Sequence, residues 1–127
     1  MASISVLFEL PATASDFTSD VTIKHHQGKT TLLFTYYDEH EEKQYSLIIH
    51  DVYMSRFSTD ACCTPFQIEN GYEQIVALSN SDWVDSLYTL SKTNDIPVEQ
   101  SLKHFLIYIP DFGCCEFLAA EVSESVQ

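Results

Sequence analysis

Two apolar segments near the end of the chain constrain its fold more than any other feature. His104–Ile109 (HFLIYI) and Cys114–Val122 (CCEFLAAEV) are rich in apolar residues that suit strands and flank Pro110–Gly113 (PDFG). Proline and glycine in a short connection between two such segments are typical of a β-hairpin loop. The sequence therefore predicts an antiparallel strand pair here, and we expect residues 123–127 to be a frayed tail.

Further segments upstream have the composition of β-strands. They are Ile4–Leu10, Val21–Ile23, Thr30–Tyr37, Tyr45–Phe57 and Tyr72–Leu78. Gln27-Gly28 predicts a tight turn, and the segment that begins at Tyr45 is long enough to bend midway. Residues 58–71, which contain Pro65 and Gly71, are predicted to be an irregular connection.

One segment has the periodicity of a helix. Trp83, Val84, Leu87, Leu90 and Ser91 share one helical face. Ser79 and Asp82 stand in capping-box spacing before it, and Pro97 ends it. We expect a helix of about three turns that inserts Trp83 and Leu87 into the apolar face of a sheet.

These elements predict an α+β fold. We expect a twisted, mainly antiparallel sheet of about six or seven strands with one main helix packed on it. A chain of 127 residues supports one hydrophobic core, so we expect residues 1–127 to form a single domain.

The charge balance limits the possible partners. Six Lys and Arg face 19 Asp and Glu, for a formal net charge of -13, and residues 65–127 hold 2 basic and 10 acidic side chains. Phosphate binding requires a basic surface, so nucleic acid is excluded as a direct ligand and a basic protein partner is favoured. Alternatively, the acidity only supports solubility.

An acidic turn, Asp38–Glu42 (DEHEE), is the most distinctive candidate for binding. Carboxylates this close repel one another and favour a cationic neighbour, and the tyrosines beside them are common in interfaces. The predicted partner-binding residues are Tyr37, Asp38, Glu39, Glu41, Glu42 and Tyr45. The alternative is a solvated hairpin tip whose charges protect a sheet edge from aggregation.

The cysteines and histidines do not predict a metal site. Cys62-Cys63 and Cys114-Cys115 are adjacent pairs, and neighbouring residues of a strand point to opposite faces, which disfavours shared ligation. The same reasoning applies to His25-His26. We expect no metal and no cofactor, and we expect cytosolic thiols, although a disulfide between the two cysteine pairs remains open.

The search for catalytic motifs gives no candidate. The sequence contains no nucleophile elbow, no glycine-rich phosphate loop and no helical His-Glu zinc motif. Asp111 and Glu116 flank the C-terminal hairpin, but two acids near a turn are usually solvated. We therefore expect no enzymatic activity. With no basic-plus-apolar leader and no long apolar run, we also expect a cytoplasmic protein without a membrane segment.

Several short segments recur in one order in a group of small bacterial proteins. They are Tyr72 with Ile75-Val76, Ser81–Val84, His104–Tyr108 and Phe112–Ala119. Over residues 72–119 the chain resembles small acidic immunity proteins of toxin–immunity systems, including contact-dependent growth inhibition. This resemblance implies a cytoplasmic protein that neutralises a cognate toxin domain by direct binding. It transfers no functional residue, because the specificity surfaces of such proteins differ from pair to pair.

Two other classes of function stay open at this point. One is a structural or regulatory domain that could form a homodimer and whose acidity is incidental. The other is a small metal-binding protein that uses cysteine and histidine. The oligomeric state and the identity of any toxin are not determined by the sequence.

Overall fold

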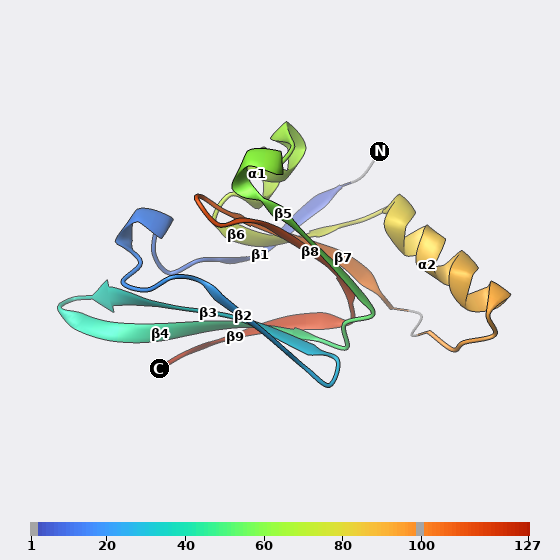
Figure 1. Cartoon of the computed structure of the whole chain (residues 1–127), viewed down its shortest axis with the longest axis horizontal. Helices are drawn as coiled ribbons and strands as arrows, with labels where there is room; N and C mark the ends of the chain where they lie inside the picture. The colour runs from blue at the N-terminus through green and yellow to red at the C-terminus, as the bar shows by residue number, and fades with distance from the viewer. Residues whose placement is uncertain (1–2, 99–100) are drawn as a thin grey trace.

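The computed structural model describes residues 3–98 and 101–127, which form two antiparallel sheets and two α-helices (Figure 1). The first sheet has the order β1 (Ile4–Glu9), β6 (Gln74–Leu78), β7 (Lys103–Ile109), β8 (Gly113–Ala119) and β5 (Met54–Thr59). The second has the order β2 (Thr22–His26), β3 (Lys29–Asp38), β4 (Glu41–His50) and β9 (Glu121–Val126). The helices are α1 (Pro65–Gly71) and α2 (Asp82–Thr93), with short 3-10 turns at Ala14–Asp16 and Asp60–Cys62. The α+β class is confirmed, but the prediction of one sheet with six or seven strands is wrong.

The main core lies between the two sheets. On β3 and β4 alternate side chains point inward, among them Leu32, Phe34 and Leu47, because successive residues of a strand face opposite sides. They pack against Phe105 and Phe117 from the five-stranded sheet. This face-to-face packing fixes the register of both sheets, since a shift by one residue would expose every core side chain.

A long two-stranded ribbon contributes to both sheets. One of its strands consists of β4 followed by β5, and the other consists of β8 followed by β9. β4 pairs with β9 in one sheet and β5 pairs with β8 in the other. The ribbon bends where Asp51 adopts φ 54° and where Ala120 donates its N–H to the His50 carbonyl at 3.1 Å. The predicted bend in residues 45–57 is therefore confirmed. The predicted frayed tail is wrong, because residues 121–126 form β9 along β4.

The predicted hairpins are present. Gln27 (φ 48°) and Gly28 (φ 77°) form the tight turn between β2 and β3. In the C-terminal hairpin Ile109 pairs with Gly113, which adopts φ 135°. A Cβ atom at Gly113 would lie 2.2 Å from the Ser58 carbonyl oxygen, so glycine is required there.

Helix α1 covers the outer face of the five-stranded sheet, where the sequence predicted an irregular connection. Thr64 caps the helix, Pro65 occupies its first turn, and Gln67 completes a reciprocal capping box with Thr64. Ile68 packs with Leu106 on that face. The Thr-Pro-x-Gln pattern is a helix start that outweighs the proline as a breaker.

Helix α2 lies at the end of the molecule opposite the β3–β4 turn (Figure 1). Its cap is Ser81 rather than Ser79, because the Ser81 side chain accepts the Val84 N–H. Leu87 is buried against Leu118, as predicted, whereas Leu90 is 51% exposed. Over the described residues, neither helix combines the length and apolar character needed to span a bilayer.

Candidate binding surface and buried polar network

The acidic tip, which we define as Tyr37, Asp38, Glu39, Glu41 and Glu42, is the exposed end of the β3–β4 hairpin. Asp38 pairs with Glu41 across the hairpin, so Glu39 and His40 form a two-residue turn with φ 50° and 72°. Every residue of the acidic tip is exposed, with Tyr37 at 62%. Lys43 forms an ion pair with Asp38 at 3.1 Å, which raises the pKa of the lysine. The three glutamates extend from the paired strands and their turn into solvent.

Tyr45, which the sequence grouped with these residues, lies in the core instead. It is 1% exposed, and its hydroxyl donates to Glu124 at 2.7 Å. Burial, helped by this hydrogen bond, raises the pKa of the phenol far above its usual range. Tyr45 and Phe34 lie on the inward face of the hairpin, so Tyr45 supports the acidic tip from below and is not part of its surface.

Two more acidic residues lie on the segment that runs beside β3. Phe17 forms a bridge with Tyr36, and the Thr18 N–H donates to the Thr35 carbonyl at 2.8 Å. These contacts hold the exposed side chains of Asp16 and Asp20 on a segment next to the hairpin. The negative charge at this end of the molecule therefore extends beyond the turn itself.

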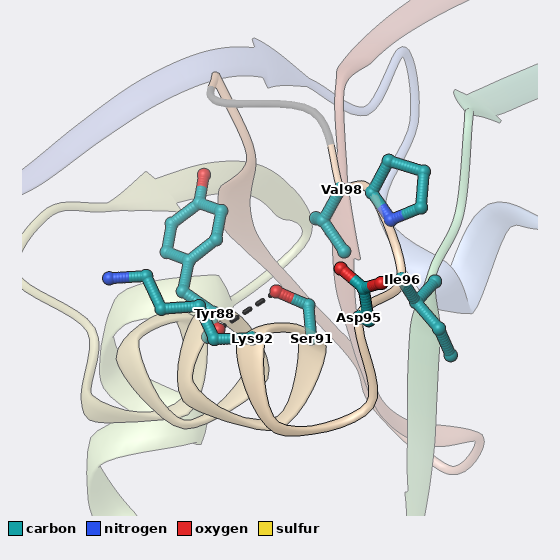
Figure 2. Close-up of a pocket in the computed structure, with 7 residues that line it drawn as sticks. Tyr88, Ser91, Lys92, Asp95, Ile96 and Val98 are labelled. Carbon is teal, nitrogen blue, oxygen red and sulfur yellow. Dashed lines mark hydrogen bonds between the residues drawn. The ribbon is translucent and has the colours of Figure 1, made fainter.

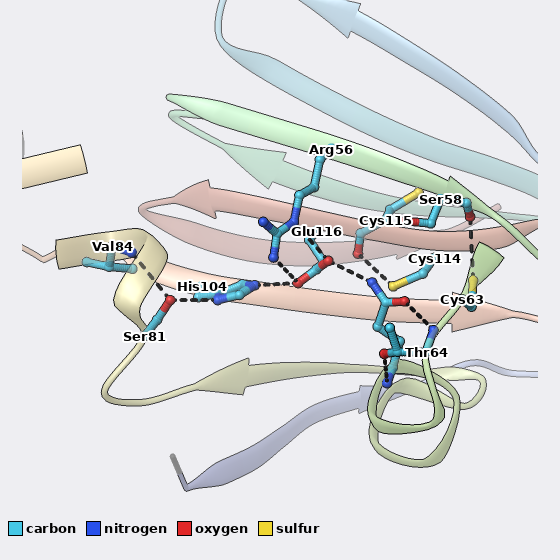
Figure 3. A network of polar contacts seen from close by, with 11 residues as sticks. Arg56, Ser58, Cys63, Thr64, Ser81, Val84, His104, Cys114, Cys115 and Glu116 are labelled. Carbon is cyan, nitrogen blue, oxygen red and sulfur yellow. Dashed lines mark hydrogen bonds and ion pairs between the residues drawn. The ribbon is translucent and has the colours of Figure 1, made fainter. Parts of the chain in front are cut away.

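A buried polar network surrounds Glu116, a residue that is 4% exposed (Figure 3). Its carboxylate accepts Arg56 Nε at 3.0 Å and Arg56 Nη2 at 3.1 Å, Gln67 Nε2 at 2.8 Å and His104 Nε2 at 2.7 Å. We call Arg56, Gln67, Ser81, His104 and Glu116 the Glu116 network. Arg56 comes from β5, Gln67 from α1, and His104 and Glu116 from the adjacent strands β7 and β8. One carboxylate thus ties four elements together.

The donors determine the protonation state of Glu116. Burial alone would raise the pKa of its carboxyl group, but hydrogen bonds from His104, Arg56 and Gln67, together with the Arg56 charge, lower that pKa to about 2. The group is therefore an ionised acceptor at neutral pH, and the bidentate guanidinium fixes its plane.

The imidazole ring of His104 has a second hydrogen-bond partner. Its Nδ1 atom lies 2.7 Å from Ser81 Oγ at the start of α2. The Ser81 oxygen also accepts the Val84 N–H at 3.3 Å. The Trp83 and His104 rings pack edge-on, with their centroids 5.2 Å apart. The Arg56 guanidinium carbon lies 4.1 Å from the Trp83 ring centroid. These contacts hold the imidazole from both sides.

Two open pockets lie beside α2. One, of about 480 Å³, is lined by Arg56, Leu78, Asn80, Ser81, Asp82, Trp83, Ser86 and His104, so it opens onto the Glu116 network. The other, of about 520 Å³, lies at the far end of the helix between Tyr88 and Val98 (Figure 2). There the Ser91 hydroxyl donates a hydrogen bond to the Tyr88 carbonyl at 2.8 Å.

All four cysteines are free thiols. Cys114 packs under α1 and Cys115 packs between the sheets, which confirms that strand neighbours point to opposite faces. Burial raises the pKa of both thiols, that of Cys115 to about 12. Cys63 packs against the cluster that contains Cys114, and Cys62 is exposed. Within residues 3–98 and 101–127, no group of three or more His, Cys, Asp or Glu is placed to hold a metal ion.

The remaining sequence candidates are separated by the fold. His25 Nδ1 lies 2.8 Å from Thr30 Oγ1, beside the β2–β3 turn, with His26 exposed. Asp111 lies in the β7–β8 loop, where its N–H donates to Asp60 at 2.8 Å, whereas Glu116 is buried within β8. Asp111 and Glu116 therefore differ in environment and are not a catalytic pair of solvated acids.

Sequence reasoning missed most of the Glu116 network. The detectable sign is a charged residue inside the apolar run Cys114–Ala119, because a carboxylate in a buried strand requires donors. The hairpin register then places His104 diagonally across from Glu116 on the same face. Arg56, Gln67 and Ser81 are distant in sequence and could not be assigned. Comparison of the chain with known protein families, with curated proteins and with solved structures found no match in any of the three.

Proposed function

We propose that this protein is a cytoplasmic immunity protein that neutralises a cognate toxin domain by binding its basic surface through the acidic tip. The observation that carries the proposal is the exposed row of carboxylates on the β3–β4 hairpin beside the exposed Tyr37. The resemblance of residues 72–119 to immunity proteins supports the same class of function. A nuclease is the favoured toxin, because nucleases bind phosphates with basic surfaces.

The electrostatics of the acidic tip favour a cationic partner. Glu39, Glu41 and Glu42 repel one another in the free protein, and a basic surface would relieve this repulsion. The hairpin pairing already holds the backbone of the acidic tip in place, so little backbone freedom need be lost on binding. A net charge of -13 would also speed the encounter with a basic protein.

Tyr37 gives the acidic tip an apolar anchor next to its charges. Its ring lies opposite Glu42 in the neighbouring strand and is 62% exposed. Tyrosine at the centre of an interface contributes buried area while its hydroxyl remains available for a hydrogen bond. A carboxylate row with an aromatic anchor can occupy a groove that otherwise holds phosphates.

The direct test is neutralisation of a toxin encoded beside this gene. Co-expression with the toxin domain should restore growth, and the purified pair should form a complex whose association slows about tenfold or more as salt rises to screening levels. If the neighbouring gene encodes no toxin and no toxin of the same genome is neutralised, the proposal is wrong.

Matched variants locate the interface. In the first variant Glu39, Glu41 and Glu42 become Gln; in the second the same change is made at Glu9, Glu69 and Glu121, which are exposed elsewhere. Both lose three charges, so a difference between them reports position rather than net charge. We expect association to slow about tenfold in the first variant and less than about threefold in the second. Equal effects would exclude the acidic tip as the interface.

The second candidate function, a self-associating structural domain, is favoured by the edge of the five-stranded sheet. Among the described strands β1 is an edge strand that pairs with β6, and its side chains Ile4, Val6 and Leu7 are 38%, 52% and 38% exposed. Apolar edge strands tend to pair with other strands, and two copies of β1 could pair antiparallel about a twofold axis. Such a dimer should survive about 1 M salt and dissociate in Val6→Lys, as measured by light scattering.

A further inference from the structure

We propose that Ser81 is a nucleophile activated by His104, and that the pocket it lines accepts small uncharged carboxylic esters and hydrolyses them through an acyl-Ser81 intermediate. The geometry that points to this activity is a row of three hydrogen-bonded side chains (Figure 3). Ser81 Oγ lies 2.7 Å from His104 Nδ1, and His104 Nε2 lies 2.7 Å from Glu116 Oε1. A hydroxyl, an imidazole and a carboxylate in contact are the parts of an activated serine. This activity is separate from toxin binding, because helix α2, which Ser81 caps, lies at the opposite end of the molecule from the β3–β4 turn (Figure 1).

The Glu116 carboxylate determines which nitrogen of His104 donates to it. Glu116 is an ionised acceptor, so the Nε2 atom of His104 carries a proton and donates it. The proposed activity requires the neutral ring, in which Nδ1 holds a lone pair and accepts the Ser81 hydroxyl. The Val84 N–H occupies one lone pair of Ser81 Oγ and leaves the other available to attack. Partners on both nitrogens exclude a flipped ring, which would place carbon atoms there.

The pocket is suited to a small substrate. Its volume of about 480 Å³ lies within the range of ligand sites. The exposed side of the Arg56 guanidinium and the Asp82 carboxylate both line it, so neither an anion nor a cation is favoured as a whole. The Asp82 N–H follows Ser81 at the start of the 12-residue helix α2, where the first N–H groups have no intrahelical partner. In the proposed reaction this N–H is the candidate donor to the acyl oxygen.

The reaction conserves atoms and electrons. Ser81 Oγ attacks the carbonyl carbon while its proton moves to His104 Nδ1, and the imidazolium is stabilised by Glu116. The ester C–O bond then breaks, and the proton on Nδ1 passes to the departing alcohol. A water molecule next gives a proton to Nδ1 and attacks the acyl carbon, which releases the carboxylic acid and returns the proton to Ser81. Nothing is oxidised or reduced.

In this scheme Ser81 and His104 are the catalytic residues, and Glu116 is a positioning residue that acts through the imidazole. Arg56 and Gln67 hold Glu116 in place and keep it ionised. The competing interpretation is that Ser81 only caps α2 and that the whole network is structural. The two interpretations differ in whether Ser81 can be acylated.

The experiment treats the full chain with a fluorophosphonate probe and with p-nitrophenyl acetate, and maps the adduct by peptide mass spectrometry. We expect the adduct on Ser81 and ester hydrolysis above the buffer rate. Ser81→Asn keeps a capping oxygen, so it should fold, yet it should lose about 100-fold or more of the hydrolysis. Ser91→Ala, on the same helix at the other pocket, should keep the rate and the Ser81 adduct.

Glu116→Gln tests the positioning role. We expect kcat to fall with little change in KM, because the His104 ring loses the ionised acceptor that orients it while the lining of the pocket is unchanged. Absence of an adduct at Ser81 in the folded wild-type protein, or unchanged hydrolysis in Ser81→Asn, would overturn the proposal and leave Ser81 as a helix cap.

Discussion

At the acidic tip, Asp38 pairs with Lys43 and the neighbouring glutamates are exposed, whereas the buried Glu116 carboxylate accepts hydrogen bonds from three side chains. The first arrangement leaves electrostatic repulsion unrelieved in the free protein, and the second satisfies a buried charge almost completely. The comparison shows that acidic residues have two different roles in this protein. Glu116 stabilises the fold, and the acidic tip is available to a partner at little cost to the fold.

Removing the buried carboxylate should have the largest effect. Glu116→Ala leaves Arg56, Gln67 and His104 without their shared acceptor, and we expect a loss of about 3–4 kcal/mol in the free energy of unfolding. Urea denaturation measures this loss in the free energy of unfolding. Under the same conditions the Gln variant of Glu39, Glu41 and Glu42 should lie within about 0.5 kcal/mol of wild type, because these side chains are exposed. Equal losses would remove the distinction between the two regions.

Acid should affect the two regions differently. The pKa of Glu116 is about 2 in the folded protein against an ordinary value of 4.5, so the unfolded chain binds more protons between these values. The contribution of Glu116 to stability, about 3 kcal/mol, is therefore complete above pH 4.5 and is lost as the pH falls toward 2.

Urea midpoints at pH 7 and at about pH 3 measure this loss. We expect wild type, and the variant with Gln at positions 39, 41 and 42, to lose more stability on acidification than Glu116→Gln does, because Gln cannot titrate. An equal acid loss in Glu116→Gln would show that other groups account for it.

Gln67 connects the helix cap to the buried charge, and its removal should have an intermediate effect. Gln67→Ala deletes the donor to Glu116 and the acceptor for the Thr64 N–H, so we expect a loss of about 2 kcal/mol. Gln74→Ala is the matched control, because the Gln74 side chain donates to a backbone carbonyl, that of Asn70, at 2.9 Å rather than to a buried charge. Its loss should be about 1 kcal/mol or less.

The smallest effect should be a gain at the acidic tip. Glu39 and His40 hold left-handed conformations that Asn and Gly adopt more easily, so the double change Glu39→Asn and His40→Gly should stabilise the hairpin by about 1 kcal/mol. Thermal unfolding measures the gain. If association with a basic partner weakens in the same variant, the turn retains its charge for binding at the expense of stability.

Local patterns in the sequence predicted the hairpins, helix α2 and most strands, because these depend on turn residues and periodicity close in the chain. The division into two sheets depends on the bend at Asp51 and on the pairing of β5 with β8, which no local pattern reveals. Tyr45 was assigned to the binding surface because its neighbours are acidic, yet the alternation of β4 turns it inward. The Glu116 network was missed because its donors meet only after α1 and β5 reach the central strands.

The shared ribbon also determines when the fold can be completed during synthesis. β2, β3 and β4 are consecutive and can pair as soon as they are made, but β5 has no neighbour in its sheet until β8 follows more than fifty residues later. Arg56 therefore has no contact with its acceptor Glu116 until β8 is made. The inward faces of β3 and β4 likewise stay uncovered until Phe105 and Phe117 are made. A nascent chain that stops before β7 would expose an apolar three-stranded meander, which makes it a substrate for chaperones or proteases rather than a partly working protein.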